Sequence, residues 1–401
     1  MTERELRDAL RGVAPDDDGA RQRAWRVVQA AYADHEPRRR RSRHRLLALA
    51  LVAALVPVAA GGAAAAGKPD SAVGQWVRGV LGVGEPGARA ALGHVPGGGR
   101  LLVQGGDGTW VVSADGAKRR LGTFAGASWS PNGLFVIAWQ GRELTALEPD
   151  GDVRWSLARP ERVALARWAP VDGFLVAYLA GSELRVVSGN GTDDHRYAAA
   201  RRDVAPAWRP DGTHVLAYVD ARDRVNVAAV DPGGSGLWRS SERLAGPVRL
   251  SWSPDGRALL AATRRELRVF DDAGRLMYAR PMPAGSALQA VEWAPRGDKV
   301  AVVRHSAAAG RSEVLLLDAA RGLRGRVLFT GPGRFNALAW SPGADRLLIG
   351  WPEADQWLFL RPIRPRGGGR LAAVANIAGQ FSPGAASPSA PRSVQWCCAG
   401  R

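Results

Sequence analysis

The sequence predicts an all-β fold, a seven-bladed β-propeller of four-stranded antiparallel blades, preceded by a short α-helical segment and one transmembrane helix. Two observations predict the propeller. A Trp-x-Pro motif occurs six times at intervals of 39 to 47 residues, and four strand-like runs with turns such as Asn-Gly or Asp-Gly recur in several of these intervals. Four short antiparallel strands in about 40–45 residues are the repeat of a propeller blade. An uncharged run of 21 residues before the repeats predicts the membrane helix.

Residues 1–37 predict two short helices on the cytoplasmic side. Leu6, Leu10 and Val13 follow helical spacing up to Pro15, and a second apolar stripe follows before Pro37. A segment of this length cannot bury a large core alone. Either the helices pack on each other or on the membrane, or residues 1–36 dock onto a cytoplasmic protein partner.

Residues 46–66 predict a transmembrane helix. At about 1.5 Å per residue they span about 31 Å, close to the bilayer core of about 30 Å. The basic flank at 38–45 holds six arginines, whereas only Lys68 follows before Arg78. The positive-inside rule therefore predicts a single-pass protein of the cell membrane, with a cytoplasmic N-terminus and an extracytoplasmic propeller. A cleaved signal peptide and a buried soluble helix are the alternatives.

Residues 67–99 connect the membrane to the repeats. Between 71 and 81, five apolar residues fall on one helical face and predict a juxtamembrane helix: Val73, Trp76, Val77, Val80 and Leu81. Residues 82–99 are typical of a linker.

Within residues 100–385, the predicted propeller, the motif has a mechanical role. Proline cannot donate to a strand ladder, so it ends the strand after the tryptophan, and Asx-Gly then turns the chain into the next strand. The tryptophans should pack between blades and not stack on a ligand. The six pairs are Trp129 and Pro131, Trp168 and Pro170, Trp208 and Pro210, Trp252 and Pro254, Trp293 and Pro295, and Trp340 and Pro342.

The segments Trp-Ser-Pro-Asn-Gly at 129–133 and Trp-Ser-Pro-Asp-Gly at 252–256 resemble the repeats of TolB-type propellers. Such repeats also occur in the propeller domains of prolyl-oligopeptidase-like enzymes. The resemblance covers about residues 92–385 and implies a propeller that binds a protein or another ligand. The Trp-Asp step of WD repeats is absent from the sequence, and a Gly-His pair occurs once, at 93–94, but does not recur among the repeats. The sequence departs there from WD-repeat proteins.

Ring closure requires one more strand. Phe381-Ser-Pro383 resembles a degraded seventh motif, and the first blade lacks a motif of its own. Residues 374–381 are therefore expected to supply the inner strand to residues 100–124, which leaves 386–401 as a C-terminal tail.

Cys397 and Cys398 are adjacent, and the sequence contains no third cysteine. A trans peptide holds neighbouring Cα atoms about 3.8 Å apart, below the usual disulfide range of about 4.4–6.8 Å. An extracytoplasmic location favours oxidation. We expect a vicinal or an intermolecular disulfide.

No catalytic constellation, metal site or cofactor fingerprint is found in the sequence. The net charge of +17 is the balance of 55 basic and 38 acidic residues. Only three of the basic residues are lysines, and outside the 38–45 run they are scattered. Nucleic-acid binding is therefore not predicted. The predicted function is a non-catalytic membrane protein whose propeller binds a protein or polymer ligand. The alternative is a secreted or periplasmic propeller enzyme, of hydrolase or lyase type, with a site in the channel.

Overall fold

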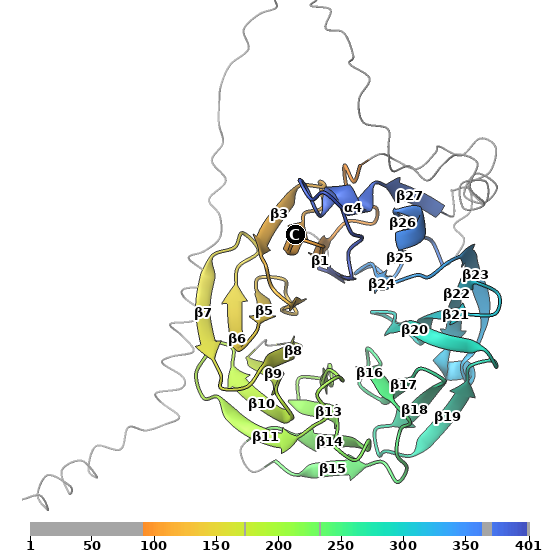
Figure 1. The fold of residues 1–401 in the computed structure, drawn as a ribbon. Helices are drawn as coiled ribbons and strands as arrows, with labels where there is room; N and C mark the ends of the chain where they lie inside the picture. Colours follow the sequence, from red (N-terminus) through yellow and green to blue (C-terminus); the bar gives the residue numbers. More distant parts are fainter. Residues whose placement is uncertain (1–90, 172–173, 232–233, 363–370, 399–401) are drawn as a thin grey trace, which may run out of the picture. The chain divides into compact units, whose positions relative to one another are not determined.

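The computed structural model describes residues 91–171, 174–231, 234–362 and 371–398. These residues form seven four-stranded antiparallel sheets that follow one another around a ring (Figure 1). The seven-bladed propeller predicted from the repeats is thus confirmed. No helix in this part of the chain has the length and apolar character needed to cross a bilayer. The predicted segments 1–37, 38–45, 46–66 and 71–81 lie outside the described residues.

Each blade runs from an inner strand beside the channel to an outer strand at the rim. Blade 1 comprises β28 (Ser393–Cys397), β1 (Arg100–Gln104), β2 (Thr109–Val112) and β3 (Lys118–Gly122). Blade 2 comprises β4 (Gly126–Trp129), β5 (Val136–Gln140), β6 (Glu143–Leu147) and β7 (Val153–Ala158). Blade 3 comprises β8 (Val163–Trp168), β9 (Leu175–Ala180), β10 (Glu183–Ser188) and β11 (His195–Ala199).

The remaining blades repeat this order. Blade 4 comprises β12 (Ala207–Trp208), β13 (Val215–Val219), β14 (Val225–Ala229) and β15 (Gly236–Arg239). Blade 5 comprises β16 (Pro247–Trp252), β17 (Ala258–Thr263), β18 (Glu266–Asp271) and β19 (Leu276–Pro281). Blade 6 comprises β20 (Ser286–Trp293), β21 (Lys299–Ser306), β22 (Arg311–Asp318), the turn η1 (Ala319–Arg321) and β23 (Arg324–Pro332). Blade 7 comprises β24 (Ala337–Trp340), β25 (Leu347–Trp351), the turn η2 (Pro352–Ala354), β26 (Gln356–Leu360) and β27 (Leu371–Ala375), and the short helix α4 (Ile377–Gln380) follows it.

The residues after each tryptophan form a hydrogen-bonded turn. In blade 2 the Ser130 hydroxyl donates to Asn132 Oδ1 at 2.8 Å, and the Gly133 amide donates to the Ser130 carbonyl at 2.9 Å. Gly133 has a φ of +67°, which glycine adopts without steric cost. Blade 5 repeats the turn, with Ser253 donating to Asp255 at 2.6 Å. The motif therefore encodes a reversal between inner and second strands.

The hydrophobic core is divided among the blade interfaces. Seven clusters of buried apolar side chains are found among the described residues, and each joins two neighbouring blades. The cluster between blades 2 and 3, for example, joins Ile137 and Trp139 to Trp168 and Tyr178. Because burial is the main favourable term in folding, each blade depends on both of its neighbours.

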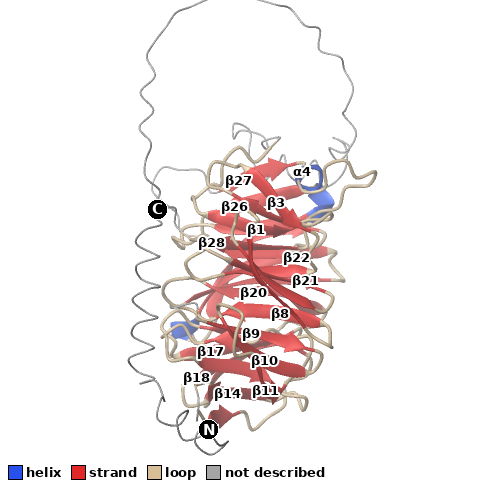
Figure 2. Cartoon of the chain, turned by 90° about the vertical axis from the view of Figure 1, so that its left-hand side faces the viewer, coloured by secondary structure: helices blue, strands red, loops and turns tan. Residues whose placement is uncertain are grey.

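The C-terminal strand β28 closes the ring. It pairs antiparallel with β1, from Arg100 opposite Cys397 to Gln104 opposite Ser393, and Figure 2 shows the two strands side by side. Its Gln395 also bonds to the inner strand of blade 2: the side-chain Nε2 donates to the Ala127 carbonyl at 2.7 Å. On the other side, Trp396 packs edge-on against Phe359 of blade 7 at 5.7 Å.

The expected closing segment was wrong. Residues 371–375 form β27, where Val374 lies opposite Trp357, so this stretch completes the outer edge of blade 7. Phe381 is fully buried between Trp357 and Trp110, at 5.1 and 6.1 Å between ring centroids. Phe381 therefore fills the core between blades 1 and 7 and belongs to no strand. The expectation that a C-terminal segment closes the ring is confirmed. The closing strand, however, is β28, which lies within residues 386–401, the segment that was expected to be a tail.

The end of the expected linker also belongs to the propeller. Leu92 and Val95 are buried in the cluster between blades 1 and 7. The Leu92 amide donates to Gln380 Oε1 at 3.0 Å, and the Val95 amide to the Ala114 carbonyl at 2.9 Å. These contacts hold residues 92–95 against blades 1 and 7, where the ring closes.

Removal of residues 392–401 from the full chain should abolish cooperative unfolding. It deletes β28 and leaves the inner edge of β1 without a partner. Removal of residues 399–401 is the matched control and should leave the thermal transition in place. Circular dichroism melts of the two truncated chains measure this, and equal, cooperative melts would contradict closure by β28.

Candidate functional site

The six motif tryptophans end the inner strands of blades 2 to 7 and lie buried against the preceding blade. Four of them donate an indole hydrogen bond across the interface. Each acceptor is the carbonyl of the residue just before the preceding blade's tryptophan: Trp208 to Arg167 at 3.0 Å, Trp252 to Ala207 at 3.0 Å, Trp293 to Ser251 at 3.0 Å, and Trp340 to Glu292 at 3.2 Å. These four bonds form a girdle that fixes the inner strands of blades 3 to 7 relative to one another, whereas the indole nitrogens of Trp129 and Trp168 have no hydrogen-bond partner among the described residues.

Blade 1 substitutes a cysteine for the tryptophan. Cys397 lies opposite Arg100, the first residue of β1, just as Trp129 lies opposite Val136, the first residue of β5. The Sγ atoms of Cys397 and Cys398 are joined at 1.99 Å. They lie 3.9 and 3.8 Å from the carbonyl oxygens of residues 130 and 131, in the turn of blade 2. The cysteine pair thus occupies the seam where the ring closes.

The inner strands line two adjoining cavities of about 910 and 580 Å³ along the channel, both open to solvent. Leu165, Arg167, Val248, Arg249, Glu292 and Pro295 line both of them. The three charged side chains in this set come from β8, β16 and β20, in blades 3, 5 and 6. We take this part of the channel as the candidate functional site.

Comparison of equivalent positions in the blades shows that Arg167, Arg249 and Glu292 stand where the other repeats have small or apolar residues. Arg167 and Glu292 directly precede the tryptophans of blades 3 and 6, where blades 2, 4, 5 and 7 have Ser128, Ala207, Ser251 and Ala339. Arg249 lies three residues before its tryptophan, where the other motif-bearing blades have Gly126, Leu165, Ala205, Ala290 and Ala337. Alignment of the repeats on their tryptophans would have revealed these residues, which the sequence analysis missed.

The electrostatics of the site follow from enclosure by protein. Burial, and then the positive charge of Arg249, lower the pKa of Arg167 to about 10. Burial raises the pKa of Glu292 to about 7, against the opposing effects of Arg249 and of the Trp340 backbone. A carboxyl group in a cavity that titrates near neutrality is a common feature of functional sites.

Other polar side chains that line the larger cavity are used within the fold. Gln104 donates to the Phe124 carbonyl at 2.8 Å, and Asn336 donates to the Pro391 carbonyl at 2.8 Å. Gln395 bridges to blade 2. Among the described residues, no group of three or more His, Cys, Asp or Glu lies close enough to hold a metal ion.

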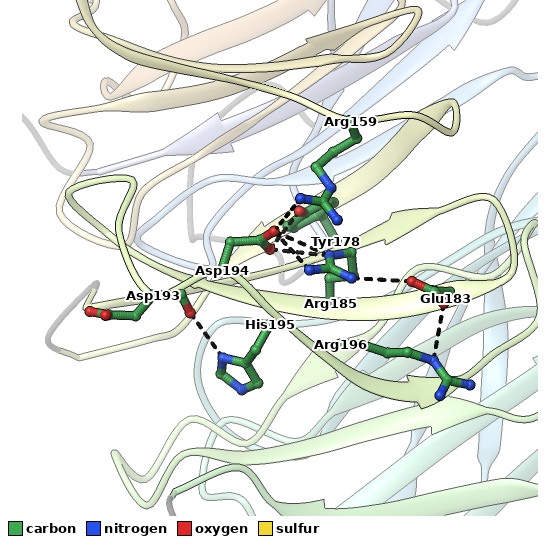
Figure 3. A network of polar contacts seen from close by, with 8 residues as sticks. All are labelled: Arg159, Tyr178, Glu183, Arg185, Asp193, Asp194, His195 and Arg196. Atoms are coloured by element: carbon green, nitrogen blue, oxygen red, sulfur yellow. Dashed lines mark hydrogen bonds and ion pairs between the residues drawn. The ribbon is translucent and has the colours of Figure 1, made fainter.

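A second polar cluster lies between blades 2 and 3 (Figure 3). Asp194 accepts a hydrogen bond from the Tyr178 hydroxyl at 2.6 Å and ion pairs from Arg159 and Arg185, each at 2.9 Å. Burial and the hydrogen bond from Tyr178 to Asp194 raise the pKa of Tyr178 well above its usual value. Since three donors from two blades already converge on this one carboxylate, the cluster is a structural tie between blades.

Comparison with known proteins supports the fold alone. No family model matches the chain, and no curated protein matches it in sequence. The β-propeller domain of Cps50 (Swd1) from Myceliophteria thermophila has a TM-score of 0.52 at 11% identity, covering 68% of this chain and 90% of that one. A functionally unknown protein from Desulfotomaculum acetoxidans has a TM-score of 0.51 at 14% identity, covering 69% and 99%.

Trp252→Phe should lower the free energy of unfolding by about 1 kcal/mol more than Trp238→Phe. Both changes remove the same atoms, but Trp252 Nε1 bonds across the blade interface, whereas Trp238 Nε1 has no hydrogen-bond partner among the described residues. A net hydrogen bond contributes about 1 kcal/mol. Urea denaturation measures both variants, and equal losses would show that the girdle bonds add nothing beyond packing.

Glu292→Gln should reduce the loss of stability with rising pH. Between pH 4.5 and about 7 the folded protein holds the Glu292 proton more tightly than the unfolded chain does, so the native carboxyl destabilises the fold as pH rises. At about 1.4 kcal/mol per pKa unit, the effect approaches 2–3 kcal/mol. Urea denaturation at pH 5 and pH 8 compares this variant with Glu161→Gln at an exposed turn. Parallel pH profiles would refute the prediction.

Proposed function

We propose that this chain is a non-catalytic binding protein whose propeller is tethered to the cell membrane and takes its ligand at the channel. The observation that carries the proposal is the pair of adjoining cavities, lined by inner strands of the ring and by three charged side chains that depart from the repeat. The likeness of its Trp-Ser-Pro-Asx-Gly segments to TolB-type repeats supports a binding role. Propellers are widely used for binding.

The proposed location rests on the N-terminal sequence. Six arginines at 38–45 precede the uncharged run at 46–66, which favours a cytoplasmic N-terminus and an extracytoplasmic propeller. Residues 1–36, with their apolar stripe, would then face the cytoplasm and dock onto a protein partner. In this arrangement the protein could report ligand binding outside the cell to a protein inside it.

The composition of the channel favours binding over catalysis. Glu292 is the one carboxylate among the described residues that line both cavities. Asp203 lines the smaller cavity but is ion-paired with Arg201 at 2.6 Å. Hydrolytic sites commonly pair a general acid with a base or a nucleophile with a base. The near-neutral pKa of Glu292 is the observation that favours the alternative, a propeller enzyme with Glu292 as general acid or base.

Reporter fusions after Glu36 and after Arg401 test the topology. We expect activity in opposite compartments, with the first reporter active in the cytoplasm and the second outside, because the arginine run should stay on the cytoplasmic side. A mature chain that begins at Gly67 or beyond, or two reporters active in the same compartment, would contradict the tethered arrangement.

Site-specific photo-crosslinking tests the binding face in the same full-length protein. A crosslinker at Gln289, which is exposed and lines the larger cavity, should capture a discrete partner in native membranes. A crosslinker at Val153, exposed on the outer strand β7, is the matched control and should not. Capture from Val153 but not from Gln289 would place binding on the rim and contradict a channel site.

A further inference from the structure

We propose that Arg167 and Arg249 form a binding site for an oxyanion group, a carboxylate or a phosphate, within the channel. The inference deepens the proposed function, because it names the ligand chemistry of the same channel. It does not depend on the membrane arrangement.

The first argument is charge balance. Two guanidinium groups and one carboxylate line both cavities, which leaves one positive charge uncompensated at this level of the channel. Within the described residues, Arg167 donates to the Ala166 carbonyl at 2.8 Å, and no ion pair joins Arg167 or Arg249 to a carboxylate. Arg167 is half-buried and Arg249 is exposed in the channel, so both guanidinium groups can be reached by a ligand. An anion there would form charge-assisted hydrogen bonds with two like charges that have no carboxylate of their own among the described residues.

The second argument is the contrast with the other arginines of the ring. Arg185 and Arg159 share Asp194, Arg268 pairs with Glu266 at 2.9 Å, and Arg304 pairs with Glu313 at 2.6 Å. The fold therefore supplies carboxylates to these arginines, whereas the half-buried Arg100 and Arg280 donate to backbone carbonyls. Arg167 has no such carboxylate, and burial, followed by the positive charge of Arg249, lowers its pKa.

The third argument is space and geometry. The neighbouring blades 2 and 4 have small residues next to the tryptophan, Ser128 and Ala207, which leave space in the channel at the level of Arg167. A cavity of about 580 Å³ holds a small organic anion. The planar guanidinium donates two parallel hydrogen bonds to carboxylate or phosphate oxygens, which makes arginine the side chain suited to such groups.

Glu292 sets the strength of the site. It interacts electrostatically with Arg249 on β16 and shares the lining of both cavities with Arg167 on β8, while Asp203 lines the smaller cavity and Arg392 the larger. Protonation of Glu292 near pH 7 removes the negative charge that competes with the ligand. The contribution of Glu292 should therefore favour anion binding as pH falls from 8 to 6.

Isothermal titration calorimetry of the purified full-length protein with inorganic phosphate and with citrate tests the site. We expect at least one of the two anions to bind, and their relative affinities distinguish a phosphate ligand from a carboxylate ligand. Arg249→Gln should weaken binding tenfold or more. Arg275→Gln, in the same blade but with its side chain 83% exposed, is the matched control and should change the affinity less than twofold. Glu292→Gln should tighten binding several-fold at pH 8 and leave only the pH dependence that the titration of the anion itself produces.

The proposal is overturned if neither anion binds at pH 6, or if Arg249→Gln and Arg275→Gln bind equally well while both retain the wild-type thermal transition. Crosslinking at Gln289 without anion binding would leave the proposed binding function standing and refute this ligand class. Anion binding with reporters in the same compartment would support the site and refute the tethered arrangement.

Discussion

The pairing of β28 with β1 is the constraint on which the rest of the structure depends. A propeller blade has apolar side chains on both faces, so each blade needs two neighbours, and a ring gives every blade two only if it closes. Here the closing strand comes from the far end of the chain, and Gln395 extends its contacts to the inner strand of blade 2. The cluster of Leu92 and Val95 with Phe381 fills the interface beside it. Closure therefore fixes both ends of the described chain in one blade.

A closed ring also determines what the channel can present. The girdle bonds, such as Trp208 to the Arg167 carbonyl, hold successive inner strands in a fixed relation. They use the backbone of the residue before each tryptophan and leave its side chain free to vary. That position can thus be serine in one blade, arginine in the next and glutamate in a third without loss of the interblade bond. Arg167 and Glu292 are charged at this position, and the ring brings them to a common space with Arg249.

Much of this architecture could be predicted from the sequence, because the residues that end each inner strand and form the following turn lie next to one another in the chain. Proline and glycine at fixed offsets from Trp129 or Trp252 encode a strand end and a turn, so blade number and inner-strand ends follow from counting. Closure could not be read in the same way. Cys397 stands where the other blades have tryptophan, and Phe381-Ser-Pro383 imitates the motif although Phe381 fills the core between blades 1 and 7.

The candidate site was missed for a different reason. Arg167, Arg249 and Glu292 lie in three separate repeats, and nothing in their local sequence marks them as neighbours. Their departure from the repeat consensus is visible once the copies are aligned, but their convergence is a property of the ring. The Asp194 cluster has the same origin, since Arg159 comes from the preceding repeat.

Native-state hydrogen exchange tests the closed ring most directly. The account predicts that the amides of β28 and β1 exchange with the same opening free energy as those of the other inner strands, such as β24, because all of them open only when the ring opens. Exchange of the β28 amides through a separate, far easier opening, while β1 and β24 remain protected, would contradict it.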